Sequence, residues 1–319
     1  MPSAPPVALR LVRSHFLGGR EAVVDGVPAM RRQVIDNAPE RDIDMNGSYY
    51  AGQIYAQEFR LAEPRHASPV LLWHGGGMTG AQWEATPDGR PGWLWRFLQA
   101  GYDVFVADAP ERGRASWAMF PQVYRQAPIF RSKEEAWRLF RIGAGQAGAE
   151  PFPGQQFPVE AFDVFARQFV PRWLGHDDMA MQGYRELLRL SGPAIVVAHS
   201  QGGGYAARLA AGHPSAIAAV VAIEPTGVPC GAPGCTAPHL AVWGDHFAAS
   251  DIWQAYRARA QAYWHALKAR GMRADEINLP AAGLAGNSHF CMLDRNSDAV
   301  ADRILAWLGH ALQPQSVHP

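Results

Sequence analysis

A serine flanked by small residues carries the strongest chemical signal in this sequence. Residues 198–202 read Ala-His-Ser-Gln-Gly and lie between an apolar run and a stretch rich in Gly and Ala. A strand that turns sharply into a helix at a serine pushes its hydroxyl clear of the sheet, and the residues two positions away on either side must be small. Ala198 and Gly202 satisfy this requirement. The motif therefore predicts that Ser200 is a nucleophile; a glycine-rich turn that packs tightly or binds phosphate is the structural alternative.

A nucleophilic serine requires a base, and His289 is the candidate for that role. The chain order expected with this motif is serine, acid, histidine, so the histidine should follow the last strand. Residues 274–279 are predicted to form that strand, and His289 is the only histidine between it and a terminal helix predicted at residues 295–308. We therefore expect His289 to take the proton of the Ser200 hydroxyl.

Two acidic residues compete for the position that orients this base. Glu224 ends one apolar run and precedes Pro225, whereas Asp245 follows the next apolar run. Asp245 holds the position that is usual in this arrangement, and Glu224 lies one strand earlier. A glutamate at the end of a buried strand nevertheless needs a partner, and an imidazolium is a suitable one. The residues alone favour Glu224 and leave Asp245 as the alternative acid.

A glycine-rich segment after another apolar run is typical of an oxyanion hole. His74 and three glycines, residues 74–77, follow an apolar run at residues 70–73. Glycines let backbone N–H groups turn toward a bound oxyanion, where a side chain would block them. We predict the N–H groups of Gly76 and of Gln201, the residue after the nucleophile, as the donors. A glycine turn without a catalytic part is the alternative.

The surrounding pattern predicts the elements that position these residues. Short apolar runs end in Gly, Asp, Ser, Glu or Pro, as expected for parallel strands buried on both faces. Helical stretches alternate with them, which predicts an α/β chain with a mostly parallel, doubly wound sheet. The predicted strands are residues 70–73, 104–107, 194–197, 218–223 and 239–243, and the predicted helices are 93–100, 204–211, 252–270 and 295–308.

Two regions depart from this alternation. Residues 8–12 and 21–24 are predicted to form a hairpin across Gly18-Gly19, and a longer strand is predicted at residues 49–61. Residues 115–184 contain no clear buried strand and are too long for a connecting loop, so they are predicted to form an inserted helical cap over the active site. The core would then comprise residues 1–114 and 185–319.

The composition limits the partners of the chain. It has 319 residues, 29 Lys+Arg against 29 Asp+Glu, and a hydrophobic fraction of 48%. A formal net charge of zero argues against a broad nucleic-acid or anionic-membrane surface, and no apolar run reaches the roughly 18 residues of a membrane span. The histidines lie at separate strand ends without metal-ligand spacing, so neither a metal nor another cofactor is expected. The 32 Gly and 25 Pro argue against a helical bundle.

The compartment and the oligomeric state stay open. The first residues lack a basic segment followed by an apolar one, so no signal peptide is visible; this fits a cytoplasmic protein, or a periplasmic or secreted one whose signal was removed. Cys230 and Cys235 bracket a turn-forming Gly-Ala-Pro-Gly spacer, and Cys291 is left over. The first two are either free thiols or joined in a small disulfide. A homodimer is compatible with the sequence.

Several segments together resemble one subfamily of the α/β-hydrolase superfamily, that of the bacterial Alcaligenes esterase (esterase 713). The resemblance extends over most of the chain, from about Tyr49 to Leu308, and its segments are residues 74–80, 83–90, 101–102, 198–202, 224–225, 244–246, 286–289 and 294–296. It implies an α/β-hydrolase fold and a Ser-Glu-His triad whose glutamate follows the strand after the nucleophile, which favours Glu224 over Asp245. Members of that family can carry two adjacent cysteines where this chain has Gly76-Gly77, so their substrate preference is not transferred.

These observations predict a serine carboxylesterase that hydrolyses an ester of a largely apolar small molecule through an acyl-enzyme. Cap aromatics are expected to form the core of the cap, and some of them to face the substrate; the candidates are Trp117, Phe120, Tyr124 and Phe157. Two alternatives stay open. One is a lyase or C–C hydrolase that uses His289 as a base, and the other is a ligand-binding protein without turnover.

Overall fold

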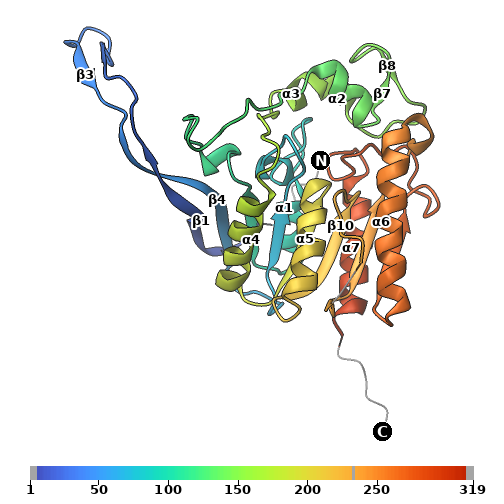
Figure 1. Cartoon of the computed structure of the whole chain (residues 1–319). Coiled ribbons are helices and arrows are strands. Elements are labelled where there is room, and N and C mark those ends of the chain that lie inside the picture. Colours follow the sequence, from blue (N-terminus) through green and yellow to red (C-terminus); the bar gives the residue numbers. More distant parts are fainter. Residues whose placement is uncertain (1–5, 232–233, 314–319) are drawn as a thin grey trace.

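The computed structural model describes residues 6–231 and 234–313, which form one large sheet with helices on both faces (Figure 1). Short helices and loops lie above the core helices in this view, and a long arm of β-strands extends away from the body. The predicted strand–helix alternation accounts for the body. The arm and the layer above the body come from the two regions that depart from it.

The sheet has eight strands in the order β1-β4-β6-β5-β9-β10-β11-β12. β1, β4 and β6 pair antiparallel, and the strands from β6 to β12 pair parallel. The bounds are β1 (Leu9–Val24), β4 (Gly47–Leu61), β5 (Val70–Trp73), β6 (Val104–Asp108), β9 (Ala194–His199), β10 (Ile217–Ile223), β11 (His239–Trp243) and β12 (Ala274–Asn278). The predicted mostly parallel α/β sheet is therefore confirmed.

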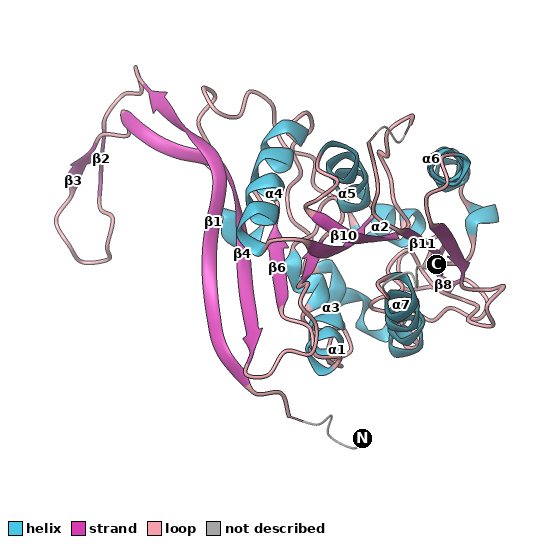
Figure 2. Cartoon of the chain, turned by 90° about the horizontal axis from the view of Figure 1, so that it is seen from below, coloured by secondary structure: helices cyan, strands magenta, loops and turns pink. Residues whose placement is uncertain are grey.

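Alternate residues of the central strands pack against helices on opposite faces. In β5, Val70 and Leu72 pack in one apolar cluster, and Leu71 and Trp73 pack in the other. α1 (Trp93–Gln99) and α7 (Ser297–Ala311) cover the first face. α4 (Asp177–Ser191), α5 (Gln201–Gly212) and α6 (Asp251–Ala269) cover the second, and Figure 2 shows both groups with the sheet between them. This double burial explains why the central strands are apolar throughout.

The predicted hairpin across Gly18-Gly19 is wrong, because β1 continues through both glycines. Gly18 pairs with Gln53 of β4, and the two strands stay paired from one end to the other. Both glycines have positive φ, 70° and 80°. A Cβ at Gly18 would lie 2.9 Å from the Cα of Gly183 in α4. The glycines therefore let the strand bend under a helix rather than turn back. The arm ends in a small sheet of β2 (Met30–Arg32) and β3 (Arg41–Ile43).

The inserted segment differs from the predicted 115–184 at its C-terminal end. Residue 184 lies in the middle of α4, whose buried face, Ala180, Tyr184, Leu187 and Leu188, packs against the sheet. α4 is thus a core helix, and the segment over the core ends near residue 176. Its elements are α2 (Lys133–Leu139), β7 (Gly143–Ala144), β8 (Glu150–Pro151) and α3 (Phe162–Ala166), with single 3-10 turns at Gly113–Ala115 and Val159–Ala161. Two further 3-10 turns, Gly80–Trp83 and Phe247–Ala249, lie in the core.

The three cysteines are free thiols in the structure, so the predicted alternative of a Cys230–Cys235 disulfide is not realised. Cys235 is buried beside His239, with its sulfur 3.9 Å from Nδ1. Cys230 is exposed and accepts a hydrogen bond from Arg259. In the ranges described, no helix is both long and apolar enough to cross a membrane.

The crossing of α4 over β4 predicts a large effect of one methyl group. A Cβ at Gly183 would lie 2.3 Å from Cγ2 of the buried Ile54. We expect Gly183→Ala to destabilise the fold by about 1–3 kcal/mol, because the crossing has no room for it. Gly309→Ala in α7 is the matched control, since its Cβ meets nothing within 4 Å, and it should stabilise by up to about 1 kcal/mol. Urea unfolding measures both, and equal effects would contradict this interpretation.

Candidate active site

Ser200 occupies a strained turn between β9 and α5. Its φ of 52° and ψ of −115° lie in a region that residues with side chains rarely adopt. Three backbone hydrogen bonds hold it there: its N–H donates to Ile223 O at 2.9 Å, and its carbonyl accepts from the N–H groups of Gly203 and Thr226, each at 3.0 Å. The surroundings thus fix a conformation that lifts the hydroxyl from the sheet.

Glycines at the start of α5 make this turn possible. A Cβ at Gly202 would lie 2.8 Å from His74 O, and one at Gly204 would lie 2.3 Å from Thr226 O. The helix therefore approaches two neighbouring loops more closely than any side chain would permit. This is the steric requirement that the sequence motif indicates.

His289 is held by a buried carboxylate. Its Nδ1 lies 2.6 Å from Oε2 of Glu224, and both side chains are almost fully buried. Since a carboxylate only accepts, Nδ1 donates, and Nε2 is the nitrogen without a proton. His289 and Ser200 line the same cavity. A neutral imidazole that carries its proton on Nδ1 and leaves Nε2 free is the tautomer that a general base beside a serine requires.

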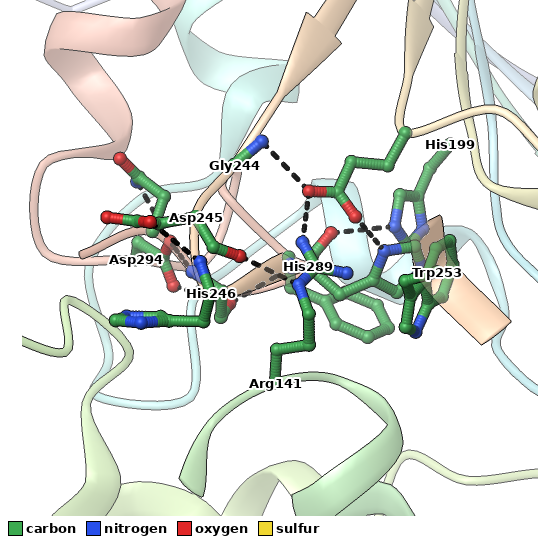
Figure 3. Close-up of polar contacts among 12 residues, drawn as sticks. Arg141, His199, Gly244, Asp245, His246, Trp253, His289 and Asp294 are labelled. Carbon is green, nitrogen blue, oxygen red and sulfur yellow. Dashed lines mark hydrogen bonds and ion pairs between the residues drawn. The ribbon is translucent and has the colours of Figure 1, made fainter. Parts of the chain in front are cut away.

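The other oxygen of Glu224 binds Arg141, which the sequence did not indicate. Oε1 accepts from Nη2 of Arg141 and, at 2.8 Å, from the N–H of Gly244. Arg141 also donates from Nε to Asp245 O at 2.8 Å, and its side chain is 0% exposed. Figure 3 shows Arg141, Gly244 and His289 converging on this point. A residue of the inserted segment thus completes the environment of the carboxylate.

These contacts set the charge states of the pair. Burial alone raises the pKa of Glu224, but the charge of Arg141 and the hydrogen bond from His289 outweigh it and bring the pKa to about 2. Burial lowers the pKa of His289 to about 4, against the opposing effect of Glu224. At neutral pH the pair is therefore a carboxylate and a neutral imidazole.

Aromatic rings and backbone bonds fix the plane of His289. The ring centroids of Trp253 and His199 lie 4.0 Å and 4.4 Å from that of His289. Its N–H donates to Phe140 O at 2.9 Å, and its carbonyl accepts from Nε2 of His199 at 3.0 Å. The imidazole is thus held in place by the inserted segment, by α6 and by the residue before Ser200.

The loop before His289 is built around Asp294. Its carboxylate accepts from the N–H and the hydroxyl of Ser288, each at 2.8 Å, and from Nδ2 of Asn287 at 2.9 Å. Burial raises the pKa of Asp294 to about 7. Figure 3 shows Asp294 apart from His289, on the far side of Asp245. Asp294 therefore acts on the loop and not on the imidazole.

Asp245, the alternative acid, has no contact with His289. Its two oxygens accept from the N–H groups of Gly286 and His246, at 2.9 Å and 2.7 Å. With these two hydrogen bonds, Asp245 stabilises the loop that carries His289. The structure thus brings Glu224, rather than Asp245, to His289.

The glycine loop of the predicted oxyanion hole is held by His74. Nε2 of His74 accepts from Ala109 N–H at 2.9 Å, so Nδ1 carries the proton and donates to Gly75 O at 2.7 Å. Gly76 and Gln201 both line the cavity beside Ser200. Among the hydrogen bonds between described residues, neither backbone N–H is used as a donor. Both groups are thus available to a bound oxyanion.

A cavity of about 410 Å³ opens over Ser200 and His289. Its wall contains both apolar side chains and three arginines, and Arg131 lies over the ring of Phe140, with Cζ 5.1 Å from the ring centroid. The apolar side chains are Leu139, Phe140, Ile252, Trp253, Tyr256 and Phe290, and the arginines are Arg131, Arg172 and Arg208. The described residues contain no group of three or more His, Cys, Asp and Glu side chains that could hold a metal ion.

None of the four aromatics expected to contact substrate lines this cavity. Phe157 is fully buried and packs 5.1 Å from Phe165 in the aromatic core above the sheet. Phe120 packs on Tyr49 of β4. Trp117 and Tyr124 pack against one another. Phe120, Tyr124 and Phe157 are buried, whereas Trp117 is exposed. The cavity wall comes from α6, from Phe290 and from other residues of the inserted segment, such as Arg131, Leu139 and Phe140.

Sequence reasoning missed several residues of the site. Trp253 and Tyr256 line the cavity and lie in a predicted helix that follows the Asp245 loop. Their position just after a strand end is a signal in the sequence that could have placed them near the site. Arg141 and Arg172 carry no such signal, because they lie in irregular segments without periodicity. Only the folded chain brings Arg141 to Glu224 and Arg172 to the cavity.

Comparisons with known proteins identify the family of the fold. A family model described as the alpha/beta hydrolase fold matches residues 68–281. A solved structure of a novel bacterial esterase is 30% identical, covers 97% of this chain and 98% of its own, and superimposes with a TM-score of 0.83. A probable secreted lipase (phiG) of a fungal species (strain ATCC 74256) is 31% identical over 194 residues, 58% of this chain. The match spans about half, 52%, of that lipase.

Removing Arg141 should destabilise the protein in a pH-dependent way. With a pKa near 2 folded and an ordinary value of 4.5, Glu224 contributes stability above pH 4.5 that is lost as the pH falls toward 2. Arg141→Gln removes the largest effect that opposes burial and raises this pKa, so we expect a loss of about 3–5 kcal/mol near pH 7. The loss should shrink as the pH falls, because Glu224 of the folded variant takes up a proton at a higher pH than Glu224 of the folded wild type.

Urea unfolding at neutral and acidic pH measures this difference. The double variant Arg141→Gln/Glu224→Gln is the control, since it removes both charges and should lack this pH dependence. A difference between wild type and Arg141→Gln that stays constant across the range would contradict the assignment.

Proposed function

The chain belongs to the α/β-hydrolase fold family, and we propose that it is a serine carboxylesterase with Ser200, His289 and Glu224 as its triad. The contact between Nδ1 of His289 and Glu224, at 2.6 Å, carries this proposal, because it leaves Nε2 as the base in the cavity that contains Ser200. The likeness to a bacterial esterase over nearly the whole chain supports the same chemistry.

In the proposed reaction, Ser200 Oγ attacks the ester carbonyl while His289 Nε2 takes its proton. The N–H groups of Gly76 and Gln201 stabilise the oxyanion, and a donor of this kind typically contributes about 10²–10³ in rate. The imidazolium returns the proton to the departing alcohol, and an acyl-Ser200 ester remains. Water then attacks this ester with His289 as base, releasing the carboxylic acid and restoring the serine.

The proposed substrate is a small molecule with an apolar part. Ile252, Trp253 and Phe290 line the cavity that contains Ser200, and their apolar surface would contact such a group. These side chains, rather than the four aromatics expected from the sequence, would hold an apolar acyl or alcohol group.

A fluorophosphonate probe tests the nucleophile directly. We expect one covalent label, placed on Ser200 by mass spectrometry and absent in Ser200→Ala. The same experiment separates the esterase from a lyase or a non-catalytic binding protein. A folded protein that hydrolyses no ester and takes no label would overturn the proposal.

The choice of acid predicts unequal effects of two substitutions. Arg141 and Gly244 donate to one oxygen of Glu224, so the amide of Glu224→Gln would turn its NH₂ toward His289 and enforce the wrong tautomer. We expect kcat for p-nitrophenyl butyrate to fall by about 10²–10⁴. Asp245→Asn is the matched control and should cost less than about tenfold, because Asp245 bonds only backbone groups. A larger loss for Asp245→Asn would identify it as the acid.

The environment of His289 predicts activity at acidic pH. Burial lowers its pKa to about 4 and keeps the imidazole neutral. The acid limb of the kcat/KM profile should therefore lie well below 6.5, and Arg141→Lys, which keeps the positive charge, should leave it there. Initial rates with p-nitrophenyl butyrate measure the profile. A midpoint at or above 6.5 would contradict a buried neutral base.

A further inference from the structure

Arg172 is an arginine of the cavity wall that has no carboxylate partner among the described residues. The other two arginines of the wall are paired: Arg131 with Glu135 at 2.5 Å, and Arg208 with Asp177 at 3.0 Å. Nε of Arg172 is buried and has no hydrogen-bond partner. Arg172 thus forms no ion pair among the described residues, although its charge also helps to lower the pKa of Asp177, which is already paired with Arg208.

The guanidinium lies directly against the proposed oxyanion loop. A Cβ at Gly76 would lie 2.8 Å from Nη1 of Arg172 and 3.1 Å from its Cζ. The same Cβ would lie 3.1 Å from Oε1 of Gln201. On the neighbouring residue, a Cβ at Gly75 would lie 3.2 Å from Cβ of Ser200. Ser200 thus lies against Gly75, and the guanidinium of Arg172 lies against Gly76.

Backbone hydrogen bonds hold Arg172 in this place. Its N–H and its carbonyl both pair with Ile129, each at 2.8 Å. Two residues earlier, the N–H of Val170 donates to Gly77 O at 3.1 Å. The segment that carries Arg172 is therefore fastened to the proposed oxyanion loop, so the fold sets the backbone position from which the guanidinium extends.

A second unpaired arginine adds to the positive potential. Arg112 is 4% exposed, and its Nε and Nη1 have no hydrogen-bond partners. It lines a small adjoining cavity that shares Asp177 and Gln201 with the main one. Glu111, next to it, binds His176. The two cavities together are lined by four arginines and three carboxylates, which leaves an excess of positive charge beside the nucleophile.

An uncompensated guanidinium in a partly desolvated wall is unfavourable unless an anion binds there. The planar fork of an arginine matches a carboxylate, with two parallel N–H···O bonds. Gly76 adds to this interpretation, because any side chain at that position would displace the guanidinium. The oxyanion loop is thus shaped to admit the charge of Arg172.

We propose that Arg172 binds a carboxylate of the substrate, so that the preferred substrates are esters of a small molecule that carries a free carboxylate a short distance from the ester bond. This inference rests on the proposed ester hydrolysis at Ser200. The apolar wall would hold one side of the ester, and Arg172 would hold the acidic group beside the oxyanion loop.

Matched substrate pairs test the inference. p-Nitrophenyl hydrogen glutarate is compared with p-nitrophenyl isoheptanoate, which has the same shape without the charge, and p-acetoxybenzoate is compared with p-acetoxybenzamide. The first pair places the carboxylate on the acyl side, and the second places it on the alcohol side. Spontaneous hydrolysis is measured with Ser200→Ala and subtracted.

In Arg172→Gln, we expect kcat/KM for the acidic member of at least one pair to fall by about 10- to 100-fold, with little change for the neutral member. Arg167→Gln removes the same charge from the same segment outside the cavity and should leave both ratios unchanged. An equal loss for acidic and neutral esters would overturn the inference and place Arg172 at the oxyanion instead. Unchanged ratios would also overturn it.

A binding measurement separates this inference from the proposed hydrolysis. Ser200→Ala is titrated with monomethyl glutarate by calorimetry, and Arg172→Gln in that background should weaken binding at least about tenfold. Binding that depends on Arg172, in a protein that hydrolyses no ester, would uphold the carboxylate site and overturn the esterase. Ester hydrolysis together with binding that ignores Arg172 would overturn the carboxylate site alone.

Discussion

The carboxylate of Glu224 is the group on which the arrangement of this site depends. It is buried at the end of β10, where it is shared between a guanidinium, a backbone N–H and an imidazole. A carboxylate in such a place is tolerated only when each oxygen is satisfied. Meeting that condition requires three separate parts of the chain: the segment above the sheet for Arg141, the end of β11 for Gly244, and the loop after β12 for His289. The site can form only when all three are in place.

This constraint explains why the segment above the sheet is more than a lid. Arg141 lies at a positive φ of 55° and reaches through to the strand ends, and the carbonyl of Phe140 accepts the N–H of His289. On the other side of the cavity, Val170 is bonded to Gly77 of the oxyanion loop. The inserted segment thus contacts both the proposed base, His289, and the proposed oxyanion loop, so its folding is coupled to the geometry of the site. Its aromatic core supplies the rigidity that such positioning needs.

A site residue can be predicted from the sequence when the reason for it lies in its neighbours along the chain. The turn at Ser200 needs small neighbours in the chain, so its motif can be recognised in the sequence. The glycine loop after β5 can be recognised for the same reason. The choice between Glu224 and Asp245 is harder, because both follow strands that end at the same edge of the sheet. Only the direction of each side chain separates them. The sequence at Gly18-Gly19 predicts a turn because the reason for Gly18, the close approach of Gly183, lies far along the chain. Arg141 and Arg172 could not be found, since no periodicity marks which residue of an irregular segment faces inward.

The apolar and the charged residues of the cavity differ in how they act on a substrate. The wall of Leu139, Ile252 and Trp253 recognises little beyond size and apolar surface, and such a wall discriminates weakly between similar esters. A guanidinium fixed by backbone bonds discriminates strongly, because a substrate without an anion leaves its charge unpaired and desolvated. Arg172 is placed at the loop whose glycines are proposed to bind the oxyanion, so a carboxylate held there would orient the ester relative to Ser200 as well as select it. Arg172 would then both select the substrate and align its ester with Ser200. The site would be locally positive although the net charge of the whole chain is zero.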